Sequence, residues 1–199
     1  MANKTLSDFK TRLIGGGARP NLFEVRLNGP IPGADDFDAE TFQFLCKAAA
    51  LPASNIAPID VPFRGRIFKV AGDRTFDTWT ITVINDEGFE IRNAMEQWMQ
   101  FIGQYGDSSG ATEPGSYMKS ANVLQLKRSR SNTGTAVYQG EGYLYAANYQ
   151  FVDIFPTNIS AIDLSYDTSD TIEEFTVEFQ VQYWVPLGKD NDGVISGSE

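Results

Sequence analysis

One segment, Val61–Trp98, constrains this chain more than any other, because a strand pattern in it runs directly into a helix pattern. Trp79, Ile81 and Val83 alternate with threonines, which is the period-two pattern of a half-buried strand. An apolar stripe at three- and four-residue spacing follows, and its members are Ile91, Ala94, Met95, Trp98 and Ile102. Such a helix buries its stripe against a sheet, so the segment predicts two packed layers.

Local signals set the expected boundaries of these elements. Asn85 and Asp86 carry side-chain oxygens of the kind that cap a first helical turn, so we expect the helix over Glu87–Ile102. Gly72-Asp73-Arg74 predicts a tight turn between a strand that ends near Val70 and the strand at Trp79.

Strand patterns dominate the rest of the chain, after a short amphipathic helix over Asn3–Leu13. The expected strands are Asn21–Asn28, Glu40–Lys47, Arg66–Val70, Ser120–Arg128, a strand or hairpin within Gly134–Phe151, Ile162–Tyr166 and Phe175–Tyr183. The last two are predicted to pair through a turn at Asp167–Asp170. The sequence therefore predicts a mainly β, α+β fold, in which residues 1–199 form a single domain built as an antiparallel two-layer barrel or sandwich with one packed helix.

Composition removes several function classes. A net charge of −10 argues against a protein that grips nucleic acid, and the one dense basic run, Lys127–Arg130, reads as a solvated hairpin tip or as a docking spot for an acidic partner. The chain has no histidine, and its single cysteine, Cys46, is interpreted as a small buried hydrophobe. We expect no catalytic residues, no cofactor and no metal site.

Hydropathy predicts no contact with a membrane. No apolar run approaches the length that spans a bilayer, and the first residues contain no hydrophobic signal segment. We therefore expect a protein that is made in soluble form and is not secreted by the general route.

A proline-marked segment, residues 48–66, is predicted to project from the domain as a long loop or loose hairpin. It contains Pro52, Pro58 and Pro62, and its apolar side chains would be costly to leave in water. The segment is therefore interpreted as a partner surface, and its candidate contact residues are Leu51, Ile56, Ile59, Val61 and Arg64.

Two polar faces are also candidates for function. The outward positions of the last two predicted strands lack Lys and Arg, and they are Asp163, Ser165, Thr176, Glu178, Gln180 and Gln182. The polar positions of the predicted helix are Glu90, Arg92, Asn93, Glu96, Gln97 and Gln100.

The residues alone leave two functions open. One is a structural protein that assembles with copies of itself, which the exposed apolar projection favours. The other is a monomeric ligand-binding β-barrel, with a pocket lined by Tyr138, Tyr143, Tyr145 and Tyr149.

Several separated blocks of the chain carry a family resemblance. The blocks are ARPNLFEV at 18–25, FLCKAAALPASNI at 44–56, VAGDRTFDTWTITVINDEGFEIRNAMEQW at 70–98 and FPTNISAIDLSYD at 155–167. In these blocks the chain resembles the major tail tube protein family of contractile-tailed bacteriophages. The resemblance is weakest over Ser131–Asn148, which looks longer, and after Trp184.

The resemblance implies six-membered rings, in which sheets of neighbouring subunits join into one barrel, stacked into a hollow tube inside a contractile sheath. The implied partners are copies of the chain itself, the tail sheath, the baseplate and the tail terminator, and DNA passes through the lumen without specific binding. The implied location is the virion, after assembly in the host cytoplasm. Phage-like bacteriocins and contractile injection systems contain related tubes, so an inner tube of that kind is the nearest alternative.

Under this resemblance each segment has an expected place. Residues 1–17 form an N-terminal arm that ends in the Gly15–Gly17 hinge, residues 48–66 reach the adjacent ring, and residues 186–199 form a flexible tail. The polar positions of the last strands are expected to face the lumen. The helix is expected on the outer side, where its polar positions contact the sheath.

Overall fold

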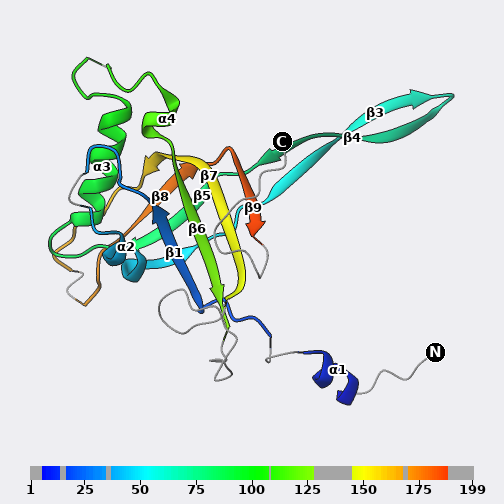
Figure 1. Ribbon diagram of the computed structural model, residues 1–199, viewed down its shortest axis with the longest axis horizontal. Coiled ribbons are helices and arrows are strands. Elements are labelled where there is room, and N and C mark those ends of the chain that lie inside the picture. The colour runs from blue at the N-terminus through cyan, green and yellow to red at the C-terminus, as the bar shows by residue number, and fades with distance from the viewer. Residues whose placement is uncertain are drawn as a thin grey trace.

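The structure, a computed structural model, describes residues 6–13, 17–34, 37–107, 109–127, 145–167 and 170–187. Its elements in chain order are α1 (Leu6–Arg12), β1 (Phe23–Asn28), α2 (Ala39–Leu45), β2 (Cys46–Ala49), β3 (Ser54–Phe63), β4 (Arg66–Phe76), β5 (Trp79–Ile84), α3 (Glu90–Ile102), α4 (Pro114–Tyr117), β6 (Lys119–Leu126), β7 (Tyr145–Ile159), β8 (Glu174–Gln180) and β9 (Tyr183–Leu187). Figure 1 shows a layered body from which the β3–β4 hairpin extends far to one side.

A seven-stranded antiparallel sheet forms the body, in the order β1-β6-β7-β8-β5-β2, with β9 paired to β7. The long strand β7 joins two halves of this sheet: its first part pairs with β6 and its last residues pair with β8. A register shift at the change of partner includes Asp153, which has a φ of +53°. Such a bulge bends a strand, so β7 carries the chain from one layer to the other.

The core lies between the layers and around α3. The indole of Trp79 stacks on Phe151 at 4.6 Å between ring centroids, and Phe179 lies between Trp79 and Trp98 at 5.3 and 5.9 Å. All four side chains are fully buried. The predicted strand at Trp79 and the predicted stripe of α3 are confirmed, with Ile102 at the partly buried edge of the stripe.

The predicted mainly β, antiparallel fold is therefore confirmed, whereas a closed barrel is not observed in the described residues. In the described part of the chain no ladder joins β1 to β2, the two strands at the ends of the sheet order. Each of them keeps one edge without a strand partner there.

The predicted strand at Glu40–Lys47 is wrong, because most of this segment is the helix α2. The carboxylate of Asp38 accepts hydrogen bonds from the backbone N–H groups of Glu40 and Thr41 at 3.0 and 3.2 Å, which caps the first helical turn. Helical spacing then places Phe42 in the core and Phe44 in water, whereas the strand pattern placed both on one side.

The predicted turn at Gly72-Asp73-Arg74 is also wrong. These residues lie inside β4, where the pairing shifts between Ile56 and Pro58, so they form a bulge. A Cβ at Gly72 would lie 2.6 Å from the carbonyl oxygen of Ala57, which explains the need for glycine. The reversal of the chain occurs instead at Arg64 and Gly65, whose φ angles are +46° and +83°.

The end of the chain differs from the prediction as well. Residues 162–166 form no strand, and β8 pairs with the last part of β7, for example Ile159 with Val177. The predicted hairpin between Ile162–Tyr166 and Phe175–Tyr183 is therefore wrong. The chain bends at Gln182 and continues as β9, which pairs with β7 in the register of the Phe155–Gln180 pair.

The helix α3 begins at Glu90, three residues later than predicted. Asp86 contributes as expected, since its carboxylate accepts from the N–H of Glu90 at 3.2 Å. Asn85 does not cap the helix, because it donates its backbone and side-chain N–H groups to Glu173. The flexible tail predicted at 186–199 is wrong over its first two residues, because Pro186 and Leu187 belong to β9 and pair with β7. The rest of that tail, the basic run at 128–130, Tyr138 and Tyr143 lie outside the described residues.

Candidate assembly surface

The projection predicted at residues 48–66 is a regular two-stranded hairpin, formed by β3 and β4. It extends farther along the chain than predicted, because β4 runs to Phe76. Five apolar side chains occupy paired or alternate positions on one face of the ribbon, and we call this face the apolar hairpin face: Ile59, Val61, Phe63, Phe68 and Val70. All five are exposed to solvent, at 42–66%.

The opposite face of the hairpin is more mixed. It carries Ile67, two prolines and an ion pair in which the ammonium of Lys69 lies 2.8 Å from the carboxylate of Asp60. Ile56 belongs to this side, because it lies three positions before Ile59 and successive residues of a strand alternate between its faces. The predicted contact residues therefore do not form one surface, and Phe63, Phe68 and Val70, which complete the apolar hairpin face, were missed.

At the tip of the hairpin a cation lies over an aromatic ring. The guanidinium carbon of Arg64 lies 5.4 Å from the ring centroid of Phe63, a cation–π distance. The predicted contact residue Arg64 thus lies at the far end of the projection, beside the last aromatic side chain of the apolar hairpin face.

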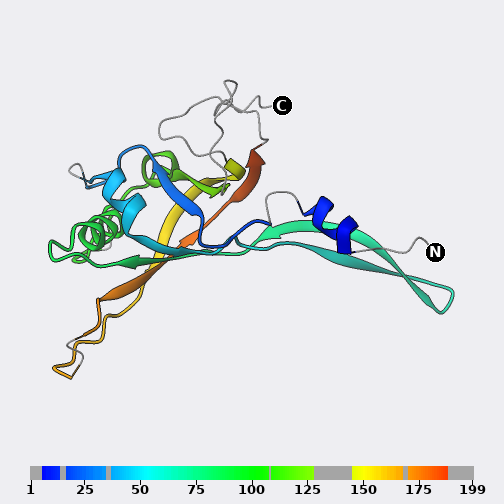
Figure 2. The ribbon, with the colours of Figure 1, turned by 90° about the horizontal axis from the view of Figure 1, so that it is seen from below.

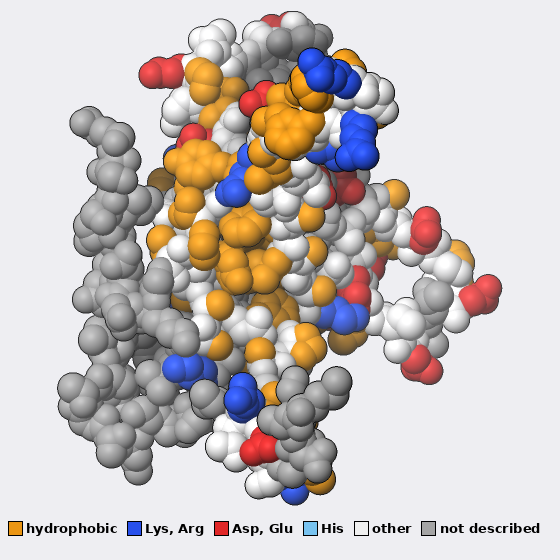
Figure 3. Space-filling model, turned by 90° about the vertical axis from the view of Figure 1, so that its right-hand side faces the viewer, with side chains coloured by type: hydrophobic (Ala, Val, Ile, Leu, Met, Phe, Trp, Pro, Cys, Tyr) orange, Lys and Arg blue, Asp and Glu red, His pale blue; other side chains and the backbone are white. Residues whose placement is uncertain are grey.

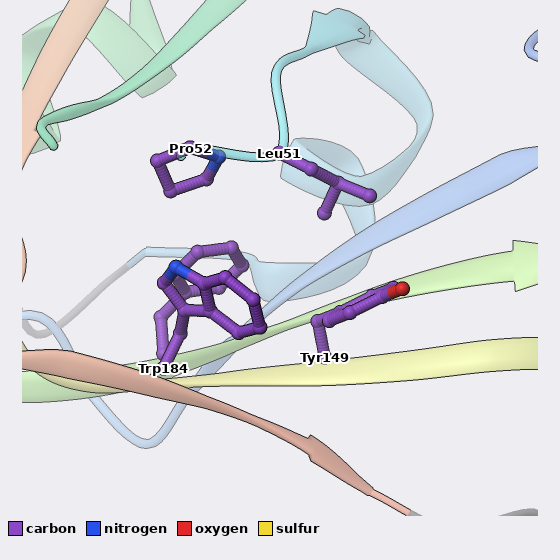
Figure 4. Close-up of a pocket in the computed structure, with 5 residues that line it drawn as sticks. Leu51, Pro52, Tyr149 and Trp184 are labelled. Atoms are coloured by element: carbon purple, nitrogen blue, oxygen red, sulfur yellow. The ribbon is translucent and has the colours of Figure 1, made fainter. Parts of the chain in front are cut away.

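Apolar side chains also gather on the body beneath the hairpin. Figure 3 looks at the side of the molecule from which the hairpin projects. Hydrophobic side chains, in orange, cover much of this side, and Lys and Arg side chains, in blue, lie close to them. This surface contains a small hollow of about 110 Å³, lined by Leu51, Pro52, Tyr149, Phe151 and Trp184. Figure 4 shows the leucine and proline on one side of it and the two labelled aromatic rings on the other.

The hollow does not support the alternative of a ligand-binding barrel. Ligand pockets usually enclose about 300–1,000 Å³, which is several times larger. Of the four tyrosines predicted to line a pocket, Tyr149 does so, and its ring meets Trp184 edge-on at 5.7 Å. The hollow is therefore a feature of the hairpin base, where Trp184 also contacts Phe76.

The polar face predicted on β8 is present over three residues. Thr176, Glu178 and Gln180 alternate with the buried Phe175, Val177 and Phe179. Thr80 and Thr82 of β5 pair with Glu178 and Thr176, so they lie on the same face. This face is polar and contains no Lys or Arg among these five positions.

The other three residues of that predicted set lie elsewhere. Asp163 and Ser165 belong to the exposed segment between β7 and β8, because no strand forms there. Gln182 lies in the bend between β8 and β9. The set of six is therefore not a single sheet face.

The outward side of α3 is likewise divided. Glu90, Asn93 and Gln97 are exposed, whereas Glu96 and Gln100 are half-buried. Arg92 is tied into the domain, since it bonds Glu96 at 2.9 Å and the carbonyl of Ser160 at 3.2 Å and lies over the ring of Phe175. Arg92 thus fixes the helix to the end of β7.

Titratable and metal-binding chemistry is sparse in the described part of the chain. Burial raises the pKa of the Cys46 thiol to about 12, against a smaller opposing effect of its hydrogen bond to Ala48. The interpretation of Cys46 as a buried hydrophobe is confirmed. The described residues contain no group of three or more potential metal ligands, and none of their helices is long and apolar enough to cross a membrane.

Comparison with known proteins places this geometry in one family. The model of a family described as phage tail tube protein matches residues 18–186. The chain is 35% identical over 179 residues to the tail tube protein gp19 of Enterobacteria phage T4, covering 89% of this chain and 98% of that protein. It is 25% identical to the tail tube protein of Serratia phage KSP90, over 88% of this chain and 93% of that protein.

Solved structures share the fold at low sequence identity. One chain of the six-fold symmetrised baseplate of the anti-feeding prophage superposes with a TM-score of 0.58 at 12% identity, over 87% of this chain and 97% of that one. A chain of the extended sheath–tube complex of the extracellular contractile injection system PVC superposes with a TM-score of 0.52 at 13% identity. This match covers 93% of the present chain and 99% of the other.

Proposed function

The chain belongs to the phage tail tube protein family, and from that premise we propose that its copies close into six-membered rings, which stack into the inner tube of a contractile tail. It is a structural component of the phage virion. Under it residues 1–199 act as one tube subunit with its N-terminal arm at residues 1–17.

The apolar hairpin face carries the proposal. A two-stranded ribbon that stands away from the body is marginally stable in water unless another surface covers it. This ribbon exposes five large apolar side chains on one face and leaves both strand edges without partners in the described part of the chain. Burial against a neighbouring ring would remove these side chains from water, and each would contribute up to about 1.5–3 kcal/mol.

Ring closure is proposed to use the free edges of β1 and β2. An exposed strand edge is a template for pairing with another chain, and closure of a ring removes all such edges at once. The two strands lie at opposite ends of the sheet order, so each copy offers one edge to each neighbour.

The polar face of Thr176, Glu178 and Gln180 is proposed to line the channel through which DNA passes. Basic side chains there would bind phosphates and hold the duplex by release of counterions, whereas these three positions carry none. Six copies with a charge of −10 each give a ring of −60, which is repulsive to DNA. The opposite side of β8 packs on α3, so the exposed Glu90, Asn93 and Gln97 would face outward, toward the sheath. Baseplate and terminator proteins would contact the two ends of the stack.

Tube formation by the purified full chain tests the proposal. We expect negative-stain microscopy to show hollow tubes or six-membered rings, and light scattering to show large assemblies at high concentration. Phe68→Asp places a charge on the apolar hairpin face and should stop tube growth.

Ile67→Asp is the matched control, because Ile67 is the adjacent residue, is equally exposed and lies on the opposite face. It should reduce assembly less than Phe68→Asp does. A wild-type chain that stays monomeric at high concentration would refute the proposed function.

A further inference from the structure

The segment between β7 and β8, residues 160–173, is a second projection with exposed apolar side chains. Leu164 and Ile172 are 83% and 72% exposed, and Tyr166 is fully exposed. The segment contains four acidic residues, Asp163, Asp167, Asp170 and Glu173, and no basic residue. We call it the acidic loop.

Both ends of the acidic loop are fixed to the domain. At its start, the carbonyl of Ser160 accepts from Arg92 at 3.2 Å and its hydroxyl accepts from the N–H of Thr176 at 2.9 Å. At its end, Glu173 accepts from Asn85 at 2.9 Å through the backbone and at 2.8 Å through the side chain. The exposed Leu164 and Tyr166 are therefore held near a fixed point of the domain.

The β3–β4 hairpin has the complementary character. Residues 54–76 contain four basic residues, Arg64, Arg66, Lys69 and Arg74, and two acidic residues, so the hairpin carries +2 within a chain of −10. Arg66 pairs with Phe63 across the ribbon, so its guanidinium lies on the apolar hairpin face. A mixed apolar and basic face is suited to an apolar and acidic partner.

The two projections leave the body in different directions. Figure 2 shows the hairpin extending to the right and the acidic loop, drawn in orange, extending to the lower left, on opposite sides of the body. They do not meet within one chain. A contact between them joins two copies head to tail, and such a contact repeats along a stack when the rotation between the copies does not close it into a ring.

We propose that the apolar hairpin face of one copy docks on the acidic loop of a copy in the adjacent ring. This inference rests on the proposed function, and it identifies the partner of the hairpin as residues 160–173 of a second copy. The apolar side chains of the two projections bury one another, while Arg64 and Arg66 approach Asp163 and Asp167. Part of the attraction is electrostatic, so added salt should lower the rate of tube growth.

Charge reversal with rescue tests the contact. The double variants Arg64→Glu/Arg66→Glu and Asp163→Arg/Asp167→Arg each place like charges opposite one another and should lower tube yield by about tenfold or more. Combining all four substitutions restores opposite charges and should recover most of the yield. Glu87→Lys/Glu113→Lys is the control for Asp163→Arg/Asp167→Arg, because it changes the net charge by the same amount and sign at exposed sites outside both projections.

A disulfide between copies gives a second readout. Tubes of the Phe68→Cys/Leu164→Cys variant should form a ladder of covalent oligomers on mild oxidation, whereas Phe68→Cys/Tyr105→Cys tubes should not. The native Cys46 is buried, so it should not interfere. Wild-type yield from Asp163→Arg/Asp167→Arg, or tubes without the ladder, would overturn this inference, whereas a wild-type chain that forms no tubes would overturn the proposed function.

Discussion

Replacement of Trp98 by alanine is the sharpest test of the layered architecture. Trp98 is fully buried in the stripe of α3, its ring contacts Phe179 and its indole N–H donates to the carbonyl of Tyr117 at 2.8 Å. Truncation of a buried aromatic side chain costs about 3–5 kcal/mol, and the carbonyl left without a partner costs about 1 kcal/mol more. Trp98→Ala is therefore expected to lower the free energy of unfolding by about 4–6 kcal/mol.

A loss of this size is comparable to the whole stability of a typical domain, about 5–15 kcal/mol. For a chain of this length it lowers the midpoint of thermal unfolding by about 10–20 °C. We expect Trp98→Ala to be largely insoluble and to yield no tubes. Trp98→Phe is the matched control, because it keeps most of the apolar volume and removes the donor, which should cost about 1–2 kcal/mol.

The measurement is urea unfolding followed by circular dichroism, at a concentration low enough for light scattering to report a monomer. The midpoint and slope give the free energy of unfolding for each variant. If Trp98→Ala lies within about 1 kcal/mol of the wild type, α3 does not anchor the two layers and the packing described here is wrong.

Three further predictions concern single side chains. The thiol of Cys46, with its pKa raised to about 12, should react with an aromatic disulfide at about pH 8 only after denaturation, and rapid reaction of the native protein would contradict its burial. Hydrogen bonds from Thr41 and Glu40 lower the pKa of Asp38, so its stabilising effect is complete above the ordinary value of 3.8 and disappears as the pH falls through the lower folded value. Acidification should therefore destabilise the wild type more than the Asp38→Asn variant. If the urea midpoints of the two proteins fall by the same amount between about pH 6 and pH 2, this prediction is wrong. Glu178→Lys should leave tube yield unchanged and lower the infectivity of phage, whereas full infectivity would show that this side chain does not face the passing DNA.

The sequence alone determined the elements whose pattern is local and strong. The alternation at Trp79–Val83 and the stripe of α3 each repeat with one period over several residues, and burial follows that period. The exposed apolar character of the projection also followed from composition, because prolines and apolar residues without an evident cover identify such a segment. Family resemblance, carried by blocks spread over the chain, identified the tail tube.

Only the tertiary structure decided how the remaining segments pair. A strand acquires its partner through contacts distant in sequence, so alternation in Ile162–Tyr166 could not show that β8 pairs with the end of β7 instead. Phe42 and Phe44 would share one face in a strand but lie on different sides of a helix, and the cap supplied by Asp38 favours the helix. The apolar hairpin face likewise depends on cross-strand register, which brings Val61 opposite Phe68 and places Ile56 on the other side. Register is a property of two strands together, and neither strand specifies it alone.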